Sequence, residues 1–574
     1  MTTLTQPNTE MTLSPAALAI LRAAPFGLDE EALRWVEQTR ARLTPQQKLR
    51  QLFNVAIHGN DLQAAQAAAG LGVGGYTRFV GEDMSSAWRA TQTLLQAAGV
   101  PPLISGDLEG GAIAMPFGTR LPNQLGLAAA DDEALSEQAV AVLASEARAL
   151  GYNWAFAPVV DINAAFRSAI VATRSYGSNP ETILAQARIN VRTFQRHGIA
   201  ATAKHWPGEG FDDRDQHLVT TLNPLDLDQW QASFGRLYRS LIDDGVMSVM
   251  SGHIAFPAYA QAHGVTGLES CRPASVSRLL NHQLLREELG FNGVIVSDAT
   301  GMAGLTGWDK RAQVVADIFN SGCDMLLFPS PFESDFAHLE QALNDGRVSW
   351  ERLDEALLRV LGMKAALGLH RQSLDQRLPE LAEAQRVIRQ AAHIEVEKQV
   401  ASASVTLIKD VRGLLPLSPE KRRRIVLVTD PDRSGFAYQA PEPLVLPALL
   451  SERGFDVRAF DPEQPPTPAD TDLVLYVLAQ ESLLTRSHIY LDWLRLHGVL
   501  RTAMRRYWHD LPCALISFGH PYYLYDAPRM PCLINAYTAT EPVQYAVLRK
   551  LLGEEPFTAS SPIDATCGLP DAIF

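Results

Sequence analysis

Acidic and basic side chains follow several short apolar runs of the sequence, at the points where predicted strands end. The run from Val294 to Ser297 leads directly into Asp298. In barrels built from alternating strands and helices, active groups lie where strands end and loops begin. Asp298 is therefore a candidate active-site carboxylate, although an aspartate here can also simply cap the following helix.

A second strand ending carries a basic pair and, further along, an acid two residues from a histidine. The run 199–203 ends on Lys204 and His205, which could bind hydroxyl groups. In the loop beyond, a turn would let Asp215 hold one imidazole nitrogen of His217 and leave the other to exchange protons. Histidine suits this work because its ordinary pKa lies near neutrality. A polar surface loop is the alternative interpretation.

The same histidines could also bind a metal ion. His205, Asp215, His217 and His253 include residue types that ligate zinc. However, no H-x-H or H-E-x-x-H pattern places two ligands on one element. We therefore expect no metal and no cofactor.

Two further strand endings contribute candidates. Asp107 follows the run 101–105 in a glycine-rich stretch and could accept bonds from two hydroxyls, or act as a local cap. Arg174 follows the run 157–162 and could reach the same pocket, although an isolated loop arginine is usually solvated.

The elements that must position these residues are predicted by an alternation of apolar runs with amphipathic stretches up to about residue 370. One amphipathic stretch, 273–289, has apolar residues at helical spacing and ends at Gly290. The pattern predicts an α/β fold with an N-terminal (β/α)8 barrel over residues 1–370, preceded by helices, and an open sheet is the competitor. The runs are 51–57, 72–76 (the weakest), 101–105, 152–158, 199–203, 247–250, 293–297 and 325–328.

Beyond the barrel, residues 371–400 are charged and resemble a connecting helix. Residues 401–574 are predicted to form a smaller α/β open-sheet (αβα sandwich) domain with a parallel sheet. Helices are expected over 444–453, 490–507 and 542–552. Strands are expected over 424–429, 456–460, 472–478, 514–518 and 532–536.

Composition excludes several classes of partner. The 574 residues carry a net charge of −14, and the one basic run, 421–424, is short, so we expect no nucleic-acid partner. No long apolar run predicts a membrane span, and residues 1–10 show no secretory signal, so a cytoplasmic location is expected. The five cysteines are scattered, which is typical of a reducing compartment.

Taken together, these motifs resemble family 3 glycoside hydrolases, and in particular their β-N-acetylhexosaminidase branch. The segment from Lys204 to Gly210, followed by Asp215-x-His217, is similar to a signature of that branch. The segment from Phe291 to Met302 resembles the nucleophile motif of the family. The likeness covers about residues 30–370 well, and 401–415 looks like the start of the family's second domain.

The resemblance implies a retaining exo-glycosidase that removes terminal β-linked N-acetylglucosamine from small glycans. Asp298 would be the nucleophile, and His217, oriented by Asp215, the general acid/base. The small carbohydrate substrate would be bound by Asp107, Arg174, Lys204, His205 and Met302.

Some features depart from the family pattern. Glu209 stands where the branch often has histidine, and Ala112 where many relatives carry arginine. A β-glucosidase is the first alternative function, and its acid would come from the second domain, with Glu481 and Glu541 as candidates. A phosphorylase, a metal-dependent barrel hydrolase and an inactive sugar-binding protein are the others. Nothing in the sequence predicts an oligomeric state.

Overall fold

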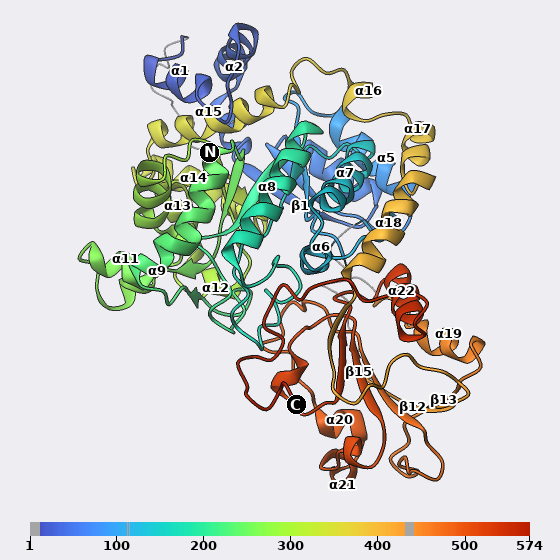
Figure 1. The fold of residues 1–574 in the computed structure, drawn as a ribbon. Coiled ribbons are helices and arrows are strands. Elements are labelled where there is room, and N and C mark those ends of the chain that lie inside the picture. The colour runs from blue at the N-terminus through green and yellow to red at the C-terminus, as the bar shows by residue number, and fades with distance from the viewer. Residues whose placement is uncertain (1–11, 112, 114, 431–440) are drawn as a thin grey trace.

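The computed structural model describes residues 12–111, 113, 115–430 and 441–574, which form a larger body and a smaller one (Figure 1). Residues 1–10 and Ala112, which were named above, lie outside these ranges. Within them, no helix is long and apolar enough to cross a membrane.

The larger body is a barrel of eight parallel strands. Their order in the sheet is β10-β1-β2-β3-β4-β5-β7-β9. A parallel bridge between Val296 and Met325 joins the two ends of this order and closes the barrel. The (β/α)8 prediction is confirmed, and each predicted run overlaps one strand. The strands are β1 Phe53–His58, β2 Gly75–Phe79, β3 Leu103–Gly106, β4 Trp154–Ala155, β5 Ala200–Trp206, β7 Ser248–Ser251, β9 Val294–Ser297 and β10 Leu326–Leu327.

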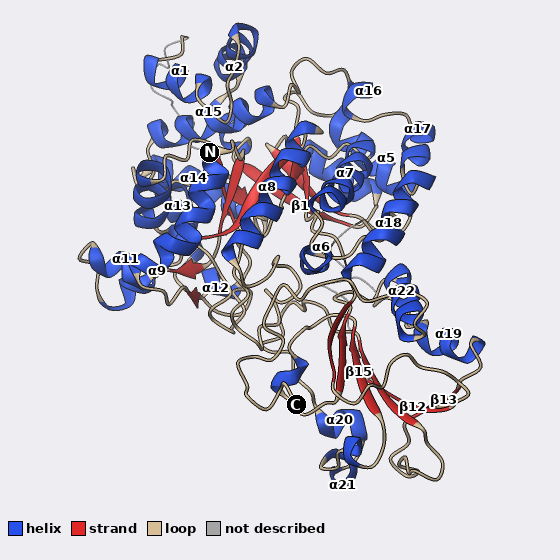
Figure 2. Cartoon of the chain, viewed as in Figure 1, coloured by secondary structure: helices blue, strands red, loops and turns tan. Residues whose placement is uncertain are grey.

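Helices surround these strands (Figure 2), so the strands are buried on both faces and appear in the sequence as continuous apolar runs. Two short parallel strands, β6 Thr221–Leu222 and β8 Ile254–Ala255, pair outside the barrel. The larger helices are α1 Pro15–Arg22, α2 Glu30–Arg42, α3 Pro45–Arg50, α4 Leu62–Gly70, α5 Met84–Gln96, α6 Gln124–Ala130, α7 Glu133–Ala149, α8 Pro180–Arg196, α10 Arg236–Asp243, α11 Pro257–Ala262, α13 Arg311–Ser321, α14 Phe332–Asn344 and α15 Trp350–Ala366. Short helices are α9 Leu227–Trp230, η1 Gln231–Gly235, η2 Gly267–Cys271 and α12 Ala303–Thr306.

The helix predicted over 273–289 is interrupted. It consists of a 3-10 turn, η3 Ala274–Val276, and a π-helix, η4 Leu279–Glu288. Gly290, with φ of +74°, follows it as predicted. The expected connecting helix over 371–400 is likewise divided, into α16 Leu374–Arg377, α17 Leu381–Val387 and α18 Ala391–Ser404.

The smaller body contains a six-stranded sheet in the order β11-β16-β15-β14-β12-β13. Five strands match the predicted ones and are parallel, but β11 pairs with β16 in the antiparallel direction, so the sheet is mixed rather than wholly parallel. The strands are β11 Thr406–Asp410, β12 Arg424–Thr429, β13 Asp456–Ala459, β14 Leu473–Leu478, β15 Cys513–Ser517 and β16 Cys532–Asn535.

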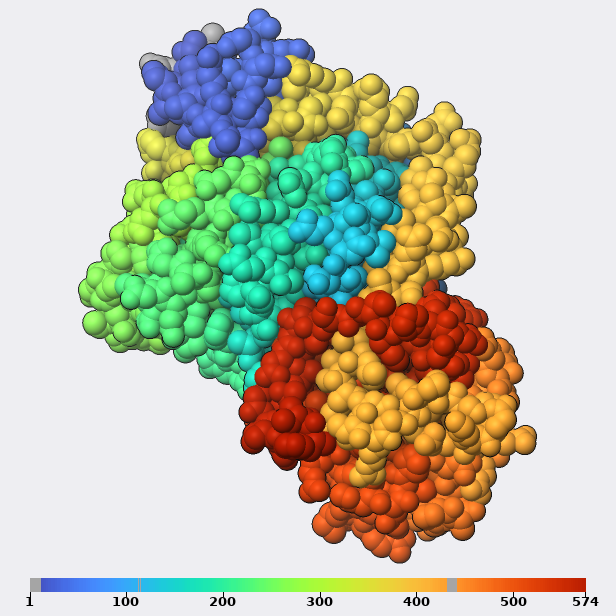
Figure 3. All heavy atoms as spheres, viewed as in Figure 1, coloured from blue at the N-terminus to red at the C-terminus, as the bar shows by residue number. Residues whose placement is uncertain are grey.

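Helices flank this second sheet. The single helix predicted over 490–507 is two short helices, α20 and α21, separated at Gly498, where φ is +76°. The helices are α19 Leu446–Glu452, α20 Trp493–His497, α21 Leu500–Ala503 and α22 Glu541–Leu551, with 3-10 turns η5 Tyr507–His509 and η6 Tyr523–Tyr525. The two bodies lie against each other in the space-filling view (Figure 3), and hydrogen bonds described below cross between them.

Candidate active site

The predicted site residues all lie at the carboxyl ends of barrel strands, where the active groups of such barrels are found. They come from the ends of four strands, β3, β4, β5 and β9, so residues up to about 200 positions apart are brought to one mouth. The predicted residues are Asp107 after β3, Arg174 in the loop after β4, Lys204 and His205 on β5, Asp215 and His217 in the loop after β5, and Asp298 and Met302 after β9.

Three of these residues, Asp107, Lys204 and Arg174, belong to a cluster of alternating charges. Glu109, which was not among the predicted residues, completes the cluster. The Lys204 ammonium lies 2.8 Å from Asp107 Oδ1 and 2.7 Å from Glu109 Oε1. Arg174 donates two hydrogen bonds of 2.9 Å to the two oxygens of Glu109. Glu109 thus links Arg174 to Lys204. A contact between Arg174 and the substrate stays a prediction.

The cations of this cluster control the charge of Glu109. Burial raises the pKa of this carboxyl, but the neighbouring Arg174 and Lys204 outweigh it and lower the pKa to about 2. Glu109 is thus an anion at neutral pH. Its partner Lys204, although buried, has a raised pKa because of Asp107 and Glu109, and stays a cation.

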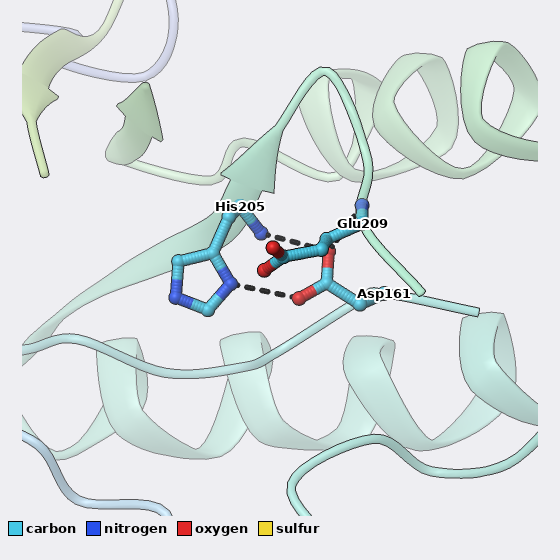
Figure 4. Close-up of side chains that lie close together, drawn as sticks. All are labelled: Asp161, His205 and Glu209. Carbon is cyan, nitrogen blue, oxygen red and sulfur yellow. Dashed lines mark hydrogen bonds and ion pairs between the residues drawn. The ribbon is translucent and has the colours of Figure 1, made fainter. Parts of the chain in front are cut away.

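His205 is fixed by Asp161, which follows β4. Its Nδ1 lies 2.7 Å from Asp161 Oδ2, and because a carboxylate only accepts, Nδ1 carries the proton (Figure 4). Backbone N–H groups of His205 and Glu209 donate to the other oxygen of Asp161, over 3.1 and 2.9 Å. The second ring nitrogen of His205, Nε2, lies 3.4 Å from Arg174 Nη2.

Glu209 is a second buried carboxyl in the mouth, and its surroundings are acidic. It accepts hydrogen bonds from the Gln216 amide at 3.0 Å and the Thr221 hydroxyl at 3.1 Å. Burial, together with the nearby Asp161 and Asp215, raises the pKa of Glu209 well above its ordinary value. Glu209 therefore holds its proton more strongly than an ordinary glutamic acid does.

The predicted pair of Asp215 and His217 is formed. His217 Nδ1 lies 2.7 Å from Asp215 Oδ1, which also accepts the His217 backbone N–H at 2.8 Å. The Asp215 side chain is 1% exposed, whereas that of His217 is 23% exposed. The carboxylate thus fixes one ring nitrogen and leaves Nε2 for proton transfer.

Asp298 lies close to three histidines. Its backbone N–H donates to the Ser251 carbonyl at 2.8 Å, which holds the end of β9 against β7. Burial raises the pKa of the Asp298 carboxyl, but His205, His253 and His217 outweigh this and lower it. The carboxyl is therefore ionised at neutral pH and has no proton to lose before it reacts.

Main-chain hydrogen bonds link the loop of His217 to the loop of Asp298. The N–H of Ala303 donates to the His217 carbonyl at 2.9 Å, and that of Gly304 to the Gln216 carbonyl at 3.2 Å. A Cβ at Gly304 would lie 2.4 Å from the Gln216 carbonyl oxygen, so this contact requires glycine. Met302, buried, begins the turn that makes these contacts.

The potential metal ligands that lie together in the structure are not the ones that the metal-dependent hydrolase hypothesis requires. Asp161, His205 and Glu209 offer ligand atoms within 4.8 Å of one another, whereas that alternative used His205, Asp215 and His217 (Figure 4). The closest of these atoms are already joined by the hydrogen bond between His205 and Asp161. The arginine cation beside His205 also opposes a metal ion by charge. The geometry therefore favours hydrogen bonding over ligation.

The two alternative acids from the second domain lie in different places. Glu481 accepts from Thr538 Oγ1 at 2.5 Å and from Asn123 Nδ2 at 3.1 Å, and a Cβ at Gly111 would lie 2.8 Å from its Oε2. It is therefore beside the loop that follows β3. Glu541 is exposed at the start of α22.

Sequence reasoning gave no role to three residues that build this mouth. Glu109 follows Asp107 by two residues, and this second acid was the available signal for it. Asp161 stands within the run 157–162. Thr485 donates its backbone N–H to Asp215 Oδ2 at 3.1 Å across 270 residues. No local pattern marks that contact.

Comparison with known proteins identifies the family of the chain. Residues 44–363 match the glycosyl hydrolase family 3 N-terminal domain. The chain is 39% identical over 568 residues to the beta-N-acetylglucosaminidase/beta-glucosidase of Cellulomonas fimi, covering 96% of this chain and 98% of that relative.

Two solved structures are also similar. Beta-glucoside phosphorylase BglX bound to 2FGlc has a TM-score of 0.88 at 34% identity, with 96% of this chain and 100% of the other covered. A family 3 beta-N-acetylglucosaminidase from Paenibacillus sp. str. FPU-7 has a TM-score of 0.77 at 24% identity, covering 92% and 100%. With the domain match spanning more than half of its length, the chain belongs to glycosyl hydrolase family 3 and is a glycosidase.

Proposed function

We propose that the chain is a retaining exo-β-N-acetylhexosaminidase that removes terminal β-linked N-acetylglucosamine from small glycans. The observation that carries this proposal is the hydrogen bond of 2.7 Å between Asp215 and His217. It supplies a histidine acid/base from the barrel itself, in a loop bound to the loop of Asp298.

In the first step, a carboxylate oxygen of Asp298 attacks the anomeric carbon as the bond to the leaving oxygen breaks. The lowered pKa of Asp298 keeps it ionised for this attack. His217, protonated on both nitrogens, gives its Nε2 proton to the leaving oxygen, and the carboxylate of Asp215 stabilises the imidazolium beforehand. The product is a covalent glycosyl-enzyme.

In the second step, a water molecule attacks the same carbon from the face that the leaving group vacated. His217, now neutral, takes a proton from this water at Nε2, and the bond to Asp298 breaks. Two displacements at one carbon retain its configuration.

The remaining predicted residues would hold the sugar. Asp107, with 25% of its side chain exposed, would accept hydrogen bonds from sugar hydroxyls. The ion pair with Lys204 would fix the Asp107 carboxylate. His205 and Arg174, fixed by Asp161 and Glu109, would form the buried end of the pocket, and Met302 part of its wall.

Small substrates such as chitooligosaccharides or muropeptide fragments suit this proposal. The five cysteines are free thiols, which supports action in the reducing cytoplasm, where such fragments would be recycled.

The test compares nitrophenyl β-N-acetylglucosaminide with nitrophenyl β-glucoside for the native enzyme and for His217→Ala. We expect the N-acetylglucosaminide to have the higher kcat/KM, and the variant to lose about 10²- to 10⁴-fold on poor leaving groups. Preference for glucoside, or an unaffected variant, would contradict the assignment. The Cellulomonas fimi relative is named for both activities, so both substrates must be measured in one preparation.

Phosphorolysis is a second candidate. The solved structure that is 34% identical to this chain is that of a beta-glucoside phosphorylase. A neutral histidine in place of a carboxylate does not repel an incoming phosphate anion. If phosphate replaces water, adding inorganic phosphate should increase the rate of the second step and yield a glycosyl 1-phosphate, which 31P NMR detects. A product that stays free sugar at high phosphate would exclude it.

A further inference from the structure

A segment of the second domain crosses to the barrel mouth. This bridging segment, residues 482–489, follows β14 and lies against the barrel loop 165–173. The N–H of Leu483 donates to the Ala169 carbonyl at 2.8 Å, and that of Ile489 to the Arg167 carbonyl at 3.1 Å. Main-chain bonds at both ends thus anchor the segment on the barrel.

Between these anchors, the bridging segment reaches the proposed acid/base. The Thr485 backbone N–H donates to Asp215 Oδ2 at 3.1 Å, while Oδ1 of the same carboxylate holds His217. Asp215 is 2% exposed, so water does not replace these partners readily. Each oxygen of Asp215 therefore has a donor from a different part of the chain, and together they fix the plane of the carboxylate.

The backbone at Thr485 is in a costly conformation. Its φ is +60°, in the left-handed region that β-branched residues rarely adopt. Such conformations persist where the surroundings hold them. Here the anchors on the barrel do so, with a further contact of 3.0 Å between His488 Nε2 and Asp213 Oδ2.

We propose that the bridging segment is a positioning element for proton transfer, in which the Thr485 N–H sets the orientation of Asp215 and thereby of the His217 ring. This inference rests on the proposed acid/base role of the pair. It gives the second domain a part in the reaction through a backbone N–H group.

The leaving group separates this role from a merely structural one. Proton donation matters for a poor leaving group and hardly at all for dinitrophenolate, which departs without a proton. A misplaced His217 therefore lowers kcat/KM for the first kind of substrate and spares the second. General damage to the fold would lower both.

The experiment measures kcat/KM for methylphenyl and dinitrophenyl β-glycosides of whichever sugar the native enzyme prefers. Thr485→Pro removes the donor, and we expect a loss of about tenfold on the methylphenyl substrate and of less than about twofold on the other. Thr485→Gly keeps the N–H and tolerates positive φ, so it should stay close to native on both.

Proline also disturbs the local backbone, so two further measurements are needed. His488→Ala weakens the anchor without changing Thr485, and should give the same selective loss with smaller size, while His509→Ala, exposed and far from the mouth, should give none. In an Asp215→Ala background, Thr485→Pro should have little added effect, because the group it acts through is gone.

Equal loss on both substrates, or full additivity with Asp215→Ala, would overturn the positioning role. His217→Ala, measured beside them, separates the two proposals. If it shows the leaving-group dependence and Thr485→Pro does not, this inference alone is wrong. If His217→Ala shows none, the proposed function fails and the inference fails with it.

Discussion

Two glutamates in the barrel mouth are equally buried, and their pKa values are shifted in opposite directions. Glu109 and Glu209 are each 2% exposed. Glu109 faces Arg174 and Lys204, which lower its pKa to about 2 although burial opposes them. Glu209 has two aspartates nearby, and burial and these anions together raise its pKa.

The difference shows that burial alone does not set the pKa of a carboxyl. The charges of the neighbouring groups decide whether the pKa is raised or lowered. Glu109 belongs to a network of full charges, whereas Glu209 accepts its hydrogen bonds from the uncharged Gln216 and Thr221. The raised pKa of Glu209 favours its neutral form, which avoids a third negative charge beside Asp161 and Asp215, the residues that orient the two histidines.

The strongest test of this contrast removes a cation beside Glu109. Arg174→Met leaves a buried carboxylate with one cation, and we expect the free energy of unfolding in urea to fall by about 3–5 kcal/mol. Adding Glu109→Gln should recover part of the loss. The control is Arg188→Met, whose pair with Asp244 is 41% and 29% exposed and should cost at most about 1 kcal/mol. Equal costs would contradict the contrast.

The second test uses acid. Because the folded pKa of Glu109 lies below its ordinary value of 4.5, its stabilising contribution is present above pH 4.5 and is lost as the pH falls toward 2. The shift corresponds to about 3 kcal/mol. Urea unfolding across this window should be less steep in pH for Glu109→Gln than for the native enzyme. Glu137→Gln, at an exposed pair with Arg196, should keep most of the native slope.

The third test concerns Glu209, for which the stabilising contribution depends on pH in the opposite direction. The folded pKa of Glu209 is raised, so its favourable contribution is complete below pH 4.5 and is lost as the pH rises through the folded value. Glu209→Gln cannot ionise and should gain stability relative to the native enzyme at alkaline pH, by about 1 kcal/mol or more. A difference that is constant between pH 5 and 9 would show that Glu209 is already ionised.

The smallest expected effect concerns the Thr221 hydroxyl, which donates to Glu209 at 3.1 Å. A bond to a neutral acid contributes about 0.5–1.5 kcal/mol, and a bond to a carboxylate about 1.5–3. Thr221→Val at pH 6 should therefore cost the lower amount in urea unfolding. A cost in the upper range would assign the charged form to Glu209.

Much of the fold was predictable because parallel strands buried on both faces leave apolar runs in the sequence. The run leading to Asp298 and that leading to Lys204 are examples, and both proved to be barrel strands. β11 was missed because, as a half-buried edge strand, it reads Thr-Leu-Ile-Lys-Asp. The helix over 490–507 was overextended because Gly498 interrupts it.

The candidate site was predictable in its members and less so in their connections. The spacing of Asp215 and His217 predicted their contact, because side chains two positions apart can meet across a single turn. The positions of Asp107, Arg174 and Lys204 at or after strand ends predicted that they converge. The ion pairs of Glu109 with two of them could not be predicted from local spacing. The contact of Thr485 with Asp215 could not be predicted, because it depends on how the two bodies pack against each other.

The main-chain bonds from Ala303 and Gly304 to the loop of His217 have an evolutionary consequence. Peptide groups, which every residue carries, tie the loop of the proposed acid/base to that of the proposed nucleophile. Substitutions can therefore remodel the pocket walls, and with them the sugar that is accepted, while this tie survives. At Gly304 substitution is excluded, because any side chain would collide with the Gln216 carbonyl oxygen. Substrate preference can thus diverge among relatives that keep one reaction.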